Sequence, residues 1–206
     1  MKVAIVGGTG TFGRALGRRL HLLGEEVRIG SRDEQRGKER ALEIGVEGGS
    51  NDEVVQGVDL VVLATKSNAA LETGAELRDA IGETPVLCVA SDLRFGPNGV
   101  LPGTLGRSLA EEVAGLLSAP VAAGLHTLAA AHLTKEDAPD EDALVCGDNE
   151  DAKRIALELA DRLVAGRALD AGPLANARAL EGMTAVILNV NKRYRAHAGV
   201  RITGLE

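Results

Sequence analysis

The fold is decided by residues 3–13, which read Val3-Ala4-Ile5-Val6-Gly7-Gly8-Thr9-Gly10-Thr11-Phe12-Gly13. The four apolar residues are typical of a short strand that is buried on both faces. The GxGxxG pattern that follows permits a tight turn and lets backbone N–H groups approach a pyrophosphate at the start of a helix. In this order it predicts a dinucleotide site that includes Gly8, Thr9, Gly10, Thr11, Phe12 and Gly13. A sharp strand-to-helix turn without a ligand is the alternative.

Strand and helix patterns alternate along the chain beyond this motif. Further buried strands are predicted at residues 27–29, 60–63, 86–89 and 121–123. Between the first two strands, apolar residues recur at helical spacing up to Leu23, and Gly24 follows where a C-terminal helix cap belongs. Such alternation is typical of α/β proteins. We therefore expect a Rossmann-like doubly wound parallel sheet over residues 1–124.

The remaining residues, 125–206, predict a small C-terminal α/β subdomain. A strand at residues 144–146 is followed by Asp148 and Asp151 in capping-box spacing, and then by a helix that includes Leu159. A longer helix is predicted after Pro173. The charged residues 132–142 lie near the start of this part, and we expect them to mark the boundary between the two domains.

The end of the second predicted strand distinguishes between dinucleotides. A site for NAD usually places an acidic residue about 20 residues beyond the glycines, where it binds the ribose 2′-hydroxyl. This chain reads Gly30-Ser31-Arg32-Asp33 there, and Arg36 follows. A hydroxyl and two guanidinium groups suit a 2′-phosphate, so Ser31, Arg32 and Arg36 favour NADP. The alternatives are that Arg32 and Arg36 form a solvated helix face, and that Asp33 binds the ribose of NAD.

The composition excludes several classes of function. The chain has 206 residues, of which 45% are hydrophobic and 26% charged, so it is long enough to bury a core. A net charge of −7, with two Phe, one Tyr and no Trp, disfavours a nucleic-acid partner. No apolar run approaches the roughly 18 residues of a membrane span. The N-terminus does not resemble a signal peptide, so we expect a cytoplasmic protein without a membrane partner.

The cysteines and histidines predict neither a disulfide nor a metal site. Cys88 and Cys146 lie far apart in apolar runs and form no CxxC pair, so we expect buried, reduced thiols. Of the four histidines, only His126 and His132 lie near each other in sequence, and a spacing of six does not bring both to one face of a helix. We therefore expect no bound metal.

Several segments together carry a resemblance to a known family. They are Gly7-Gly8-Thr9-Gly10 with Ser31-Arg32, Leu125-His126-Thr127, Cys146-Gly147-Asp148, Asp170-Ala171-Gly172-Pro173-Leu174, Leu188-Asn189-Val190-Asn191-Lys192-Arg193-Tyr194 and Ala196-His197-Ala198-Gly199. With these segments, the chain resembles the NADP-dependent reductases of coenzyme F420, which is a 5-deazaflavin, and the likeness spans essentially the whole chain. The resemblance implies an oxidoreductase that exchanges a hydride between NADPH and oxidised F420 without a metal, in a cleft between two parts of a homodimer subunit.

The resemblance also implies where the cofactors bind. By position, residues 9–12 would hold the NADP pyrophosphate. Ala64, Thr65 and Val89 end strands at the edge where a doubly wound sheet binds its ligands. His126 and the stretch to Ala130 would lie beside the two reacting rings. Hydride transfer between two cofactors needs orientation more than acid–base groups, so the catalytic residues stay unknown and His126 is only a candidate. The alternative for His126 is a hydrogen-bonded histidine at a strand end.

Two segments depart from the family pattern. Thr65-Lys66-Ser67-Asn68 stands where family members usually carry Pro and an aromatic residue, and Ala90-Ser91-Asp92-Leu93-Arg94-Phe95 replaces a Pro-containing turn. Two alternatives therefore stay open. One is an NADP-dependent reductase of a small carbonyl or imine substrate, in which Lys66 donates a proton. The other is a non-catalytic NADP-binding sensor.

The end of the chain carries a local excess of positive charge. Residues 189–203 include Lys192, Arg193, Arg195 and Arg201 and no acidic residue. F420 carries a phosphate and a polyglutamate tail, so this segment suits an anionic part of that cofactor. The alternative is that these cations complement the dipole at the end of a long helix and cover a subunit contact.

Overall fold

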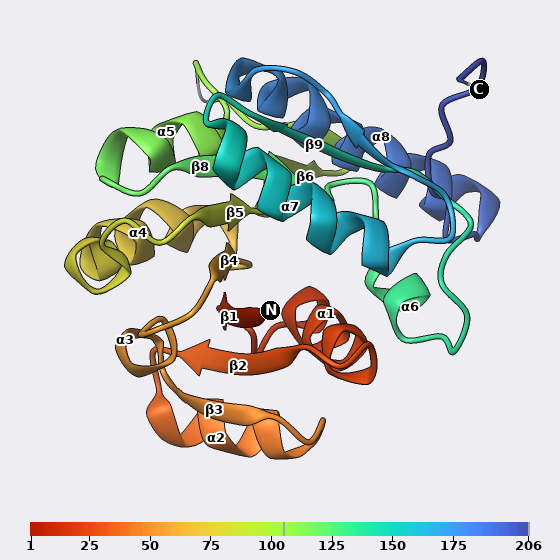
Figure 1. Cartoon of the computed structure of the whole chain (residues 1–206). Coiled ribbons are helices and arrows are strands. Elements are labelled where there is room, and N and C mark those ends of the chain that lie inside the picture. The colour runs from red at the N-terminus through yellow and green to blue at the C-terminus, as the bar shows by residue number, and fades with distance from the viewer. Residues whose placement is uncertain (105, 206) are drawn as a thin grey trace.

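The computed structural model describes residues 1–104 and 106–205, and its main element is one eight-stranded sheet (Figure 1). In spatial order its strands are β10 (Ala168–Asp170), β9 (Ala143–Gly147), β8 (Val121–Gly124), β5 (Val86–Cys88), β4 (Leu60–Leu63), β1 (Lys2–Val6), β2 (Glu26–Ser31) and β3 (Glu47–Ser50). Neighbouring strands are parallel, except that β8 and β9 are antiparallel. A separate antiparallel hairpin comprises β6 (Leu93–Gly96) and β7 (Gly99–Pro102).

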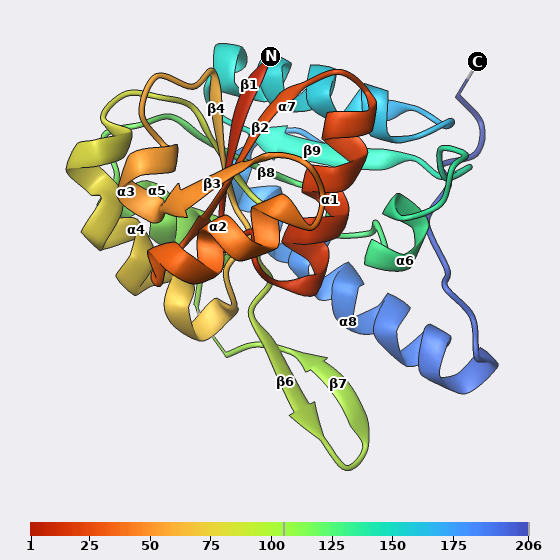
Figure 2. The same ribbon diagram turned by 90° about the horizontal axis from the view of Figure 1, so that it is seen from below.

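Helices cover both faces of this sheet (Figures 1 and 2). Side chains of α1, α6 and α7 belong to the core on one face, and those of α4, α5 and α8 to the core on the other. With the hairpin set aside, the order from β3 to β8 is that of a doubly wound Rossmann sheet, which confirms the predicted fold class. The helices are α1 (Thr11–Leu22), α2 (Glu34–Leu42), α3 (Asn51–Val54), α4 (Ser67–Ile81), α5 (Leu109–Leu116), α6 (Ala130–Leu133), α7 (Glu150–Leu163) and α8 (Ala177–Tyr194), with a short 3₁₀ helix at Leu174–Asn176.

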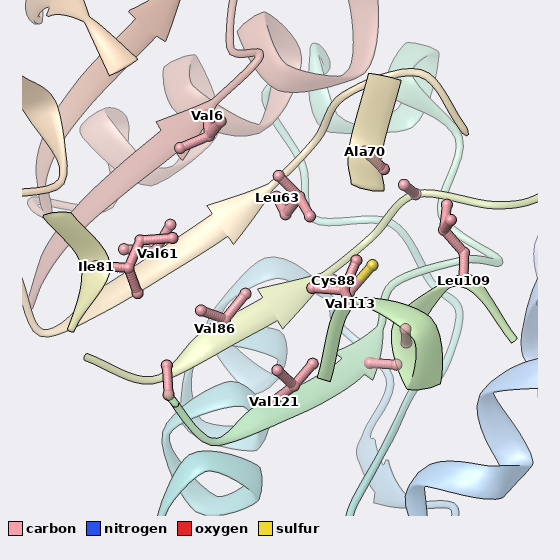
Figure 3. Close-up of a cluster of buried hydrophobic side chains, with 14 of the residues drawn as sticks. Val6, Val61, Leu63, Ala70, Ile81, Val86, Cys88, Leu109, Val113 and Val121 are labelled. Atoms are coloured by element: carbon pink, nitrogen blue, oxygen red, sulfur yellow. The ribbon is translucent and has the colours of Figure 1, made fainter. Parts of the chain in front are cut away.

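The first strand shows why its residues are all apolar. Val3 and Ile5 point into the core beneath α1 and α7, whereas Ala4 and Val6 point into the core beneath α4 and α5. Figure 3 shows the second core, in which the central strands meet these two helices and the thiol of Cys88 is buried. Each aliphatic side chain that is fully buried here stabilises the fold by about 1.5–3 kcal/mol. Both cysteines are free and buried, as predicted.

Four strands were not predicted because their sequences lack an apolar run. The clearest case is β3, which reads Glu47-Gly48-Gly49-Ser50 and forms the edge of the sheet. Gly48 of β3 and Gly37 of α2 let the helix approach closely, since a Cβ atom on Gly48 would lie 2.5 Å from the carbonyl oxygen of Gly37, and one on Gly37 would lie 2.2 Å from that of Gly49. The others are β10, with three residues, and the two strands of the hairpin. These strands form because they pair or pack with a neighbouring element, and no hydrophobic pattern in their own sequences indicates them.

The starts of two helices differ from the prediction. The N-cap of α7 is Asn149, whose side chain accepts a hydrogen bond from the backbone of Ala152, so the capping box at Asp148 and Asp151 is wrong. The Asp148 carboxylate instead accepts from the backbone N–H of Leu174. Helix α2 begins at Glu34, so Arg32 lies before the helix and does not share a helix face with Arg36.

The order of the strands places a crevice beside β1. The chain runs from β1 outward to β2 and β3, then crosses to β4 on the other side of β1. Such a switch point opens a crevice at the carboxyl ends of the two neighbouring strands, where ligands of doubly wound sheets bind. The glycine loop follows β1 there, and Ala64 and Thr65 follow β4. The predicted division after residue 124 falls at the end of β8, and β9 and β10 on its far side extend the same sheet.

Candidate functional site

Two cavities of about 580 Å³ each lie at the carboxyl ends of the strands. The glycine-loop cavity is lined by Gly7, Thr9, Gly10, Ser31, Arg32, Asp33, Arg36, Asn51, Ala64, Thr65, Lys66, Asn68, Ala69, Glu72 and Thr73. The central cavity is lined by Phe12, Ala64, Thr65, Lys66, Ser67, Asn68, Val89, Ala90, Ser91, Leu93, Phe95, Leu125, His126, Leu128 and Thr184. Because the two cavities share the connection between β4 and α4, a long ligand can occupy both.

The glycine loop is tightly folded, and its glycines serve different purposes. Gly7 has a φ of +73°, and the backbone N–H of Gly10 donates to the carbonyl of Gly7 over 3.1 Å. A Cβ atom on Gly13 would lie 2.7 Å from the Cα of Gly8, so this pair packs α1 against β1. A Cβ atom on Gly10 would meet only the carbonyl oxygen of Gly7, at 3.5 Å, which is an ordinary contact. Internal packing therefore does not require glycine at position 10, whereas a ligand that approached this turn closely would require it.

The helices that begin at the two cavities lack side-chain caps. The N-caps of α1 and α4 are Gly10 and Lys66, and neither helix has an acidic residue in its first turn. In contrast, α2, α3, α5 and α7 each begin with a capping side chain that accepts a backbone N–H. The N–H groups at the start of α1 and the positive end of its dipole are thus available to an anion beside the glycine loop.

The end of β2 presents cations to the glycine-loop cavity. The Arg32 side chain is 68% exposed, and its Nη1 lies 3.8 Å from Oε2 of Glu72 on α4, across the cavity. Asp33 is the N-cap of α2 and accepts the backbone N–H of Arg36 over 3.0 Å. Ser31 is buried, and its hydroxyl accepts the backbone N–H of Asp33. Because helix capping already engages the carboxylate of Asp33, the arrangement suits a 2′-phosphate better than a free ribose hydroxyl.

The central cavity combines apolar walls with polar atoms that lack partners. Among the described residues, neither the buried hydroxyl of Thr65 nor Nδ1 of His126 has a hydrogen-bond partner. Buried polar atoms without partners are rare in folded proteins, because each costs about 1–3 kcal/mol. Phe12, Leu125 and Leu128 supply apolar surface around them. Such a cavity fits a flat heterocycle with a few polar edges.

His126 is held in its neutral form. It lies at the end of β8 with 7% of its surface exposed, and its Nε2 is 3.2 Å from the carbonyl oxygen of Ala90. Since a carbonyl only accepts, Nε2 carries the proton and Nδ1 carries a lone pair, which is buried and has no partner among the described residues. Burial lowers the pKa of His126 to about 4, against the opposing effect of this hydrogen bond. The ring therefore acts as an uncharged acceptor at neutral pH.

Because of this shifted pKa, His126 makes the stability of the fold depend on pH. The imidazole is neutral in the folded state down to about pH 4, but the unfolded chain takes up a proton below about pH 6.5. The stabilisation is therefore complete above pH 6.5 and decreases as the pH falls towards 4, by about 3 kcal/mol in total.

We expect urea unfolding to show this loss in the wild type, and a much smaller one in His126→Gln. Burial raises the pKa of Glu181 to about 7, which opposes the trend, but this group is present in both proteins. The difference between their unfolding free energies thus isolates His126. A difference that stays constant between pH 7.5 and pH 4 would show that the histidine titrates normally.

Helix α8 closes the central cavity from the C-terminal part of the chain. The hydroxyl of Thr184 donates to the backbone carbonyl of His126 over 2.9 Å, and it lies 3.0 Å from the hydroxyl of Ser91. These contacts join the ends of β5 and β8 to α8. No sequence signal distinguished Thr184 from the other residues on its helix stripe. Asn51 was also missed, although Ser50 and Glu53 form the capping box that precedes and follows it, and that pattern is visible in the sequence.

The structure brings most of the predicted site residues together. The glycine-loop cavity is lined by Thr9, Gly10, Ser31, Arg32, Arg36, Ala64 and Thr65. The central cavity is lined by Phe12, Ala64, Thr65, Val89 and His126. Thr11 and Ala130 line a neighbouring hollow between α1 and α6, and Gly8 and Gly13 lie behind the loop, where they pack. Across residues 1–104 and 106–205, no group of three or more His, Cys, Asp or Glu is arranged to hold a metal.

The basic C-terminal segment is partly engaged by acidic residues. Arg201 pairs with Asp140, whereas Lys192 and Arg193 lie exposed in the last turn of α8. The carboxylate of Asp142 is fully buried and accepts hydrogen bonds from Arg167 and from the backbone of Ile202. The Arg167 guanidinium holds the pKa of Asp142 well below its usual range. These contacts fasten the segment to β9. Within the part of the chain that is described, no helix is both long and apolar enough to cross a membrane.

The fold and the two cavities are those of a Rossmann-type protein with a crevice of the kind that binds dinucleotides. Residues 2–91 match the family described as NADP oxidoreductase, coenzyme F420-dependent. A protein of Methanothermobacter thermautotrophicus named F420-dependent NADP reductase is 36% identical over 222 residues, which cover 100% of this chain and 96% of that protein. The chain belongs to the family of F420-dependent NADP reductases.

Solved structures agree with this assignment. A crystal structure from Arthrobacter sp. FB24, provisionally named an F420-dependent NADP reductase, superimposes with a TM-score of 0.83 and 26% identity, covering 99% of this chain and 100% of that one. A Streptomyces aurantiacus imine reductase has a TM-score of 0.62 and 19% identity, and shows a likeness of fold alone. The match covers 95% of this chain and 62% of that reductase.

Proposed function

We propose that this protein transfers a hydride between NADP(H) and coenzyme F420. The observation that carries the proposal is the pair of cavities that share Ala64 and Thr65. One has a glycine loop, an uncapped helix and two arginines, which suit a phosphorylated dinucleotide. The other has apolar walls and buried polar atoms without partners, which suit a flat ring. Membership of the F420-dependent NADP reductase family supplies the identity of the second cofactor.

The residues present fit both groups. Thr9, Gly10 and the first turn of α1 would hold the pyrophosphate, and the cradle at Gly10 has room for a ligand that a side chain would fill. Ser31, Arg32 and Arg36 would hold the 2′-phosphate. The bound pair supplies the hydride donor and acceptor. The protein's residues orient the two rings, and the apolar walls around Phe12 and Leu125 exclude water.

His126 and Thr65 would orient the rings rather than exchange protons. Nδ1 of neutral His126 is buried and carries a lone pair without a partner among the described residues, and a ring N–H that reached it would donate to this lone pair. Thr65, whose buried hydroxyl also lacks a partner there, lines both cavities where the two cofactors would meet. We assign no general acid or base. We also propose that residues 125–206 complete the cleft, because His126 and Thr184 line it from that part.

The test mixes the purified protein with NADPH and oxidised F420, and follows the loss of the deazaflavin's visible absorbance. Turnover supports the proposal. Binding of NADPH without binding of F420 would overturn it and leave the reductase of a small carbonyl or imine, or the sensor. In such a reductase Lys66 would donate the proton, and it lines both cavities at the N-cap of α4. A screen of carbonyl and imine substrates with NADPH decides between the reductase and the sensor.

Glu72 provides a smaller test of the 2′-phosphate site. Its carboxylate faces Arg32 and would repel a phosphate, so Glu72→Gln should tighten NADPH binding by up to about fivefold and leave NADH unchanged. Titrations of both nucleotides at low salt measure the effect, because salt screens exposed pairs. The matched control is Glu76→Gln, one turn along α4 and outside the cavity lining. Equal gains for NADPH and NADH would contradict the assignment.

We further propose a cytoplasmic homodimer. Two buried free thiols, Cys88 and Cys146, suit a reducing compartment. For the dimer, α8 leaves Val186, Val190 and Tyr194 exposed at intervals of four residues, which makes a continuous apolar stripe along its outer face. A second copy of the chain would cover this stripe. Light scattering of the wild type and of Val190→Glu tests the proposal, since a monomeric wild type would exclude it.

A further inference from the structure

The β6–β7 hairpin brings an aromatic ring to the rim of the central cavity. The hairpin projects from the body of the molecule beyond the end of β5 (Figure 2). Two of its residues, Leu93 and Phe95, line the cavity, and they share one face of β6 because side chains alternate along a strand. Phe95 is 75% exposed, so most of its ring is free to contact a ligand.

The hairpin is fixed to the body, so Phe95 has a defined position. The Asn189 side chain on α8 accepts the backbone N–H of Val100 over 2.9 Å and donates to the carbonyl of Val100 over 2.7 Å. At the base, the carboxylate of Glu181 accepts the backbone N–H of Asp92, whose carbonyl accepts the N–H of Gly103. The two anchoring side chains, Asn189 and Glu181, both belong to α8. A two-stranded hairpin is marginally stable alone, and these contacts hold it in place.

The rest of the central cavity offers little aromatic surface. Phe12 and Phe95 are its two aromatic lining residues, and the connection from Thr65 to Asn68 contains none. Phe12 lies in the first turn of α1, beside the glycine loop. Phe95 lies on β6 of the hairpin and does not line the glycine-loop cavity. A flat ring bound in the central cavity would therefore contact Phe95, whereas the phosphates and adenosine of NADP would not.

We propose that Phe95 is an aromatic wall of the deazaflavin site and determines the affinity of this chain for F420. The inference rests on the proposed function. Stacking buries the free face of the Phe95 ring against the deazaflavin, and removing both the buried area and the aromatic pairing should weaken binding about 10- to 100-fold. NADPH should be unaffected.

Equilibrium dialysis with oxidised F420 and, separately, with NADPH tests the proposal without turnover. Phe95→Ala should weaken F420 binding by this factor and change NADPH binding by less than about twofold, whereas Phe95→Tyr should restore F420 binding. Leu101→Ala is the matched control, because Leu101 lies exposed on β7 and does not line the cavity. Since Phe95 is exposed, we expect all three variants to fold with wild-type circular dichroism.

The results of these binding measurements distinguish a failure of the proposed role of Phe95 from a failure of the proposed function. Wild-type F420 affinity in Phe95→Ala overturns the inference and leaves the proposed function standing. Equal losses for F420 and NADPH also overturn it, since they indicate a general disturbance. A wild type that binds NADPH but no F420 overturns both.

Discussion

We expect Gly10→Val to abolish the binding of both NADPH and NADH and to leave the protein folded. A Cβ atom at position 10 contacts only the carbonyl oxygen of Gly7, and the backbone there, with φ of −73° and ψ of 168°, is open to any residue. The valine side chain would instead stand over the first N–H groups of α1, where the pyrophosphate must lie. We expect a loss of at least about 100-fold in affinity for both nucleotides, with unfolding free energy changed by less than about 1 kcal/mol.

Two other glycines complete this experiment. Gly115→Ala, at an exposed position of α5 with no atom within 4 Å of the added Cβ, should bind like the wild type. Gly13→Ala forces a contact at 2.7 Å with Gly8 and should lower the melting temperature. Isothermal titration and thermal unfolding measure the two effects. If Gly10→Val binds nucleotide normally, the glycine loop is a structural turn only.

Replacing both Arg32 and Arg36 by alanine separates NADPH from NADH. Each lost charge-assisted contact to a phosphate costs about 1.5–3 kcal/mol, so the double variant should bind NADPH on the order of 100-fold or more weakly. NADH carries no 2′-phosphate, and its affinity should stay near the wild-type value. The same variant should also lose most of the salt dependence of NADPH binding.

The control for this pair lies on the same helix. Arg40 pairs with Glu43 at the far end of α2 and does not line the glycine-loop cavity, so Arg40→Ala tests a loss of charge without a loss of contact. Parallel titrations with NADPH and NADH give the ratio of affinities. If the double variant weakens both nucleotides equally, the arginines do not read the 2′-phosphate, and the NADP assignment rests on the family alone.

The sequence predicts those parts of the fold in which a single local requirement, such as burial or a tight turn, explains each residue. Val3 to Val6 are apolar because both faces of β1 are buried, so the strand is visible without its neighbours. The glycine loop can also be predicted locally, because the spacing of its glycines follows from the backbone of one strand-to-helix turn. Ser31 and Arg32 could be proposed as site residues because they stand at the end of a predicted strand, and in the structure both line the glycine-loop cavity.

What the sequence did not predict depends on partners that are distant in the chain. Gly48 of β3 is explained by α2 packing on it, and Thr184 is explained by its contacts with His126 and Ser91, which lie 58 and 93 residues away. The role of Asp33 was ambiguous because its carboxylate suited either a ribose or a helix N-terminus. In the structure, one oxygen of that carboxylate caps α2 by accepting the backbone N–H of Arg36. The hairpin turn at residues 96–99 contains Gly, Pro and Asn, which are turn residues, but its strands lack an apolar pattern.

The pairing of β8 with β5, of β5 with β4 and of β4 with β1 also matters for binding. Because β8 precedes His126 and β1 precedes the glycine loop, a continuous ladder of backbone hydrogen bonds holds His126 relative to Gly10, and Thr184 on α8 attaches to this framework through the carbonyl of His126. The framework on which two reactants would meet is thus preorganised before either arrives. A ligand that enters a preorganised site loses less binding free energy to ordering the protein. The free-energy cost of orienting the reacting groups is met once, when the chain folds, and is not repeated at each turnover.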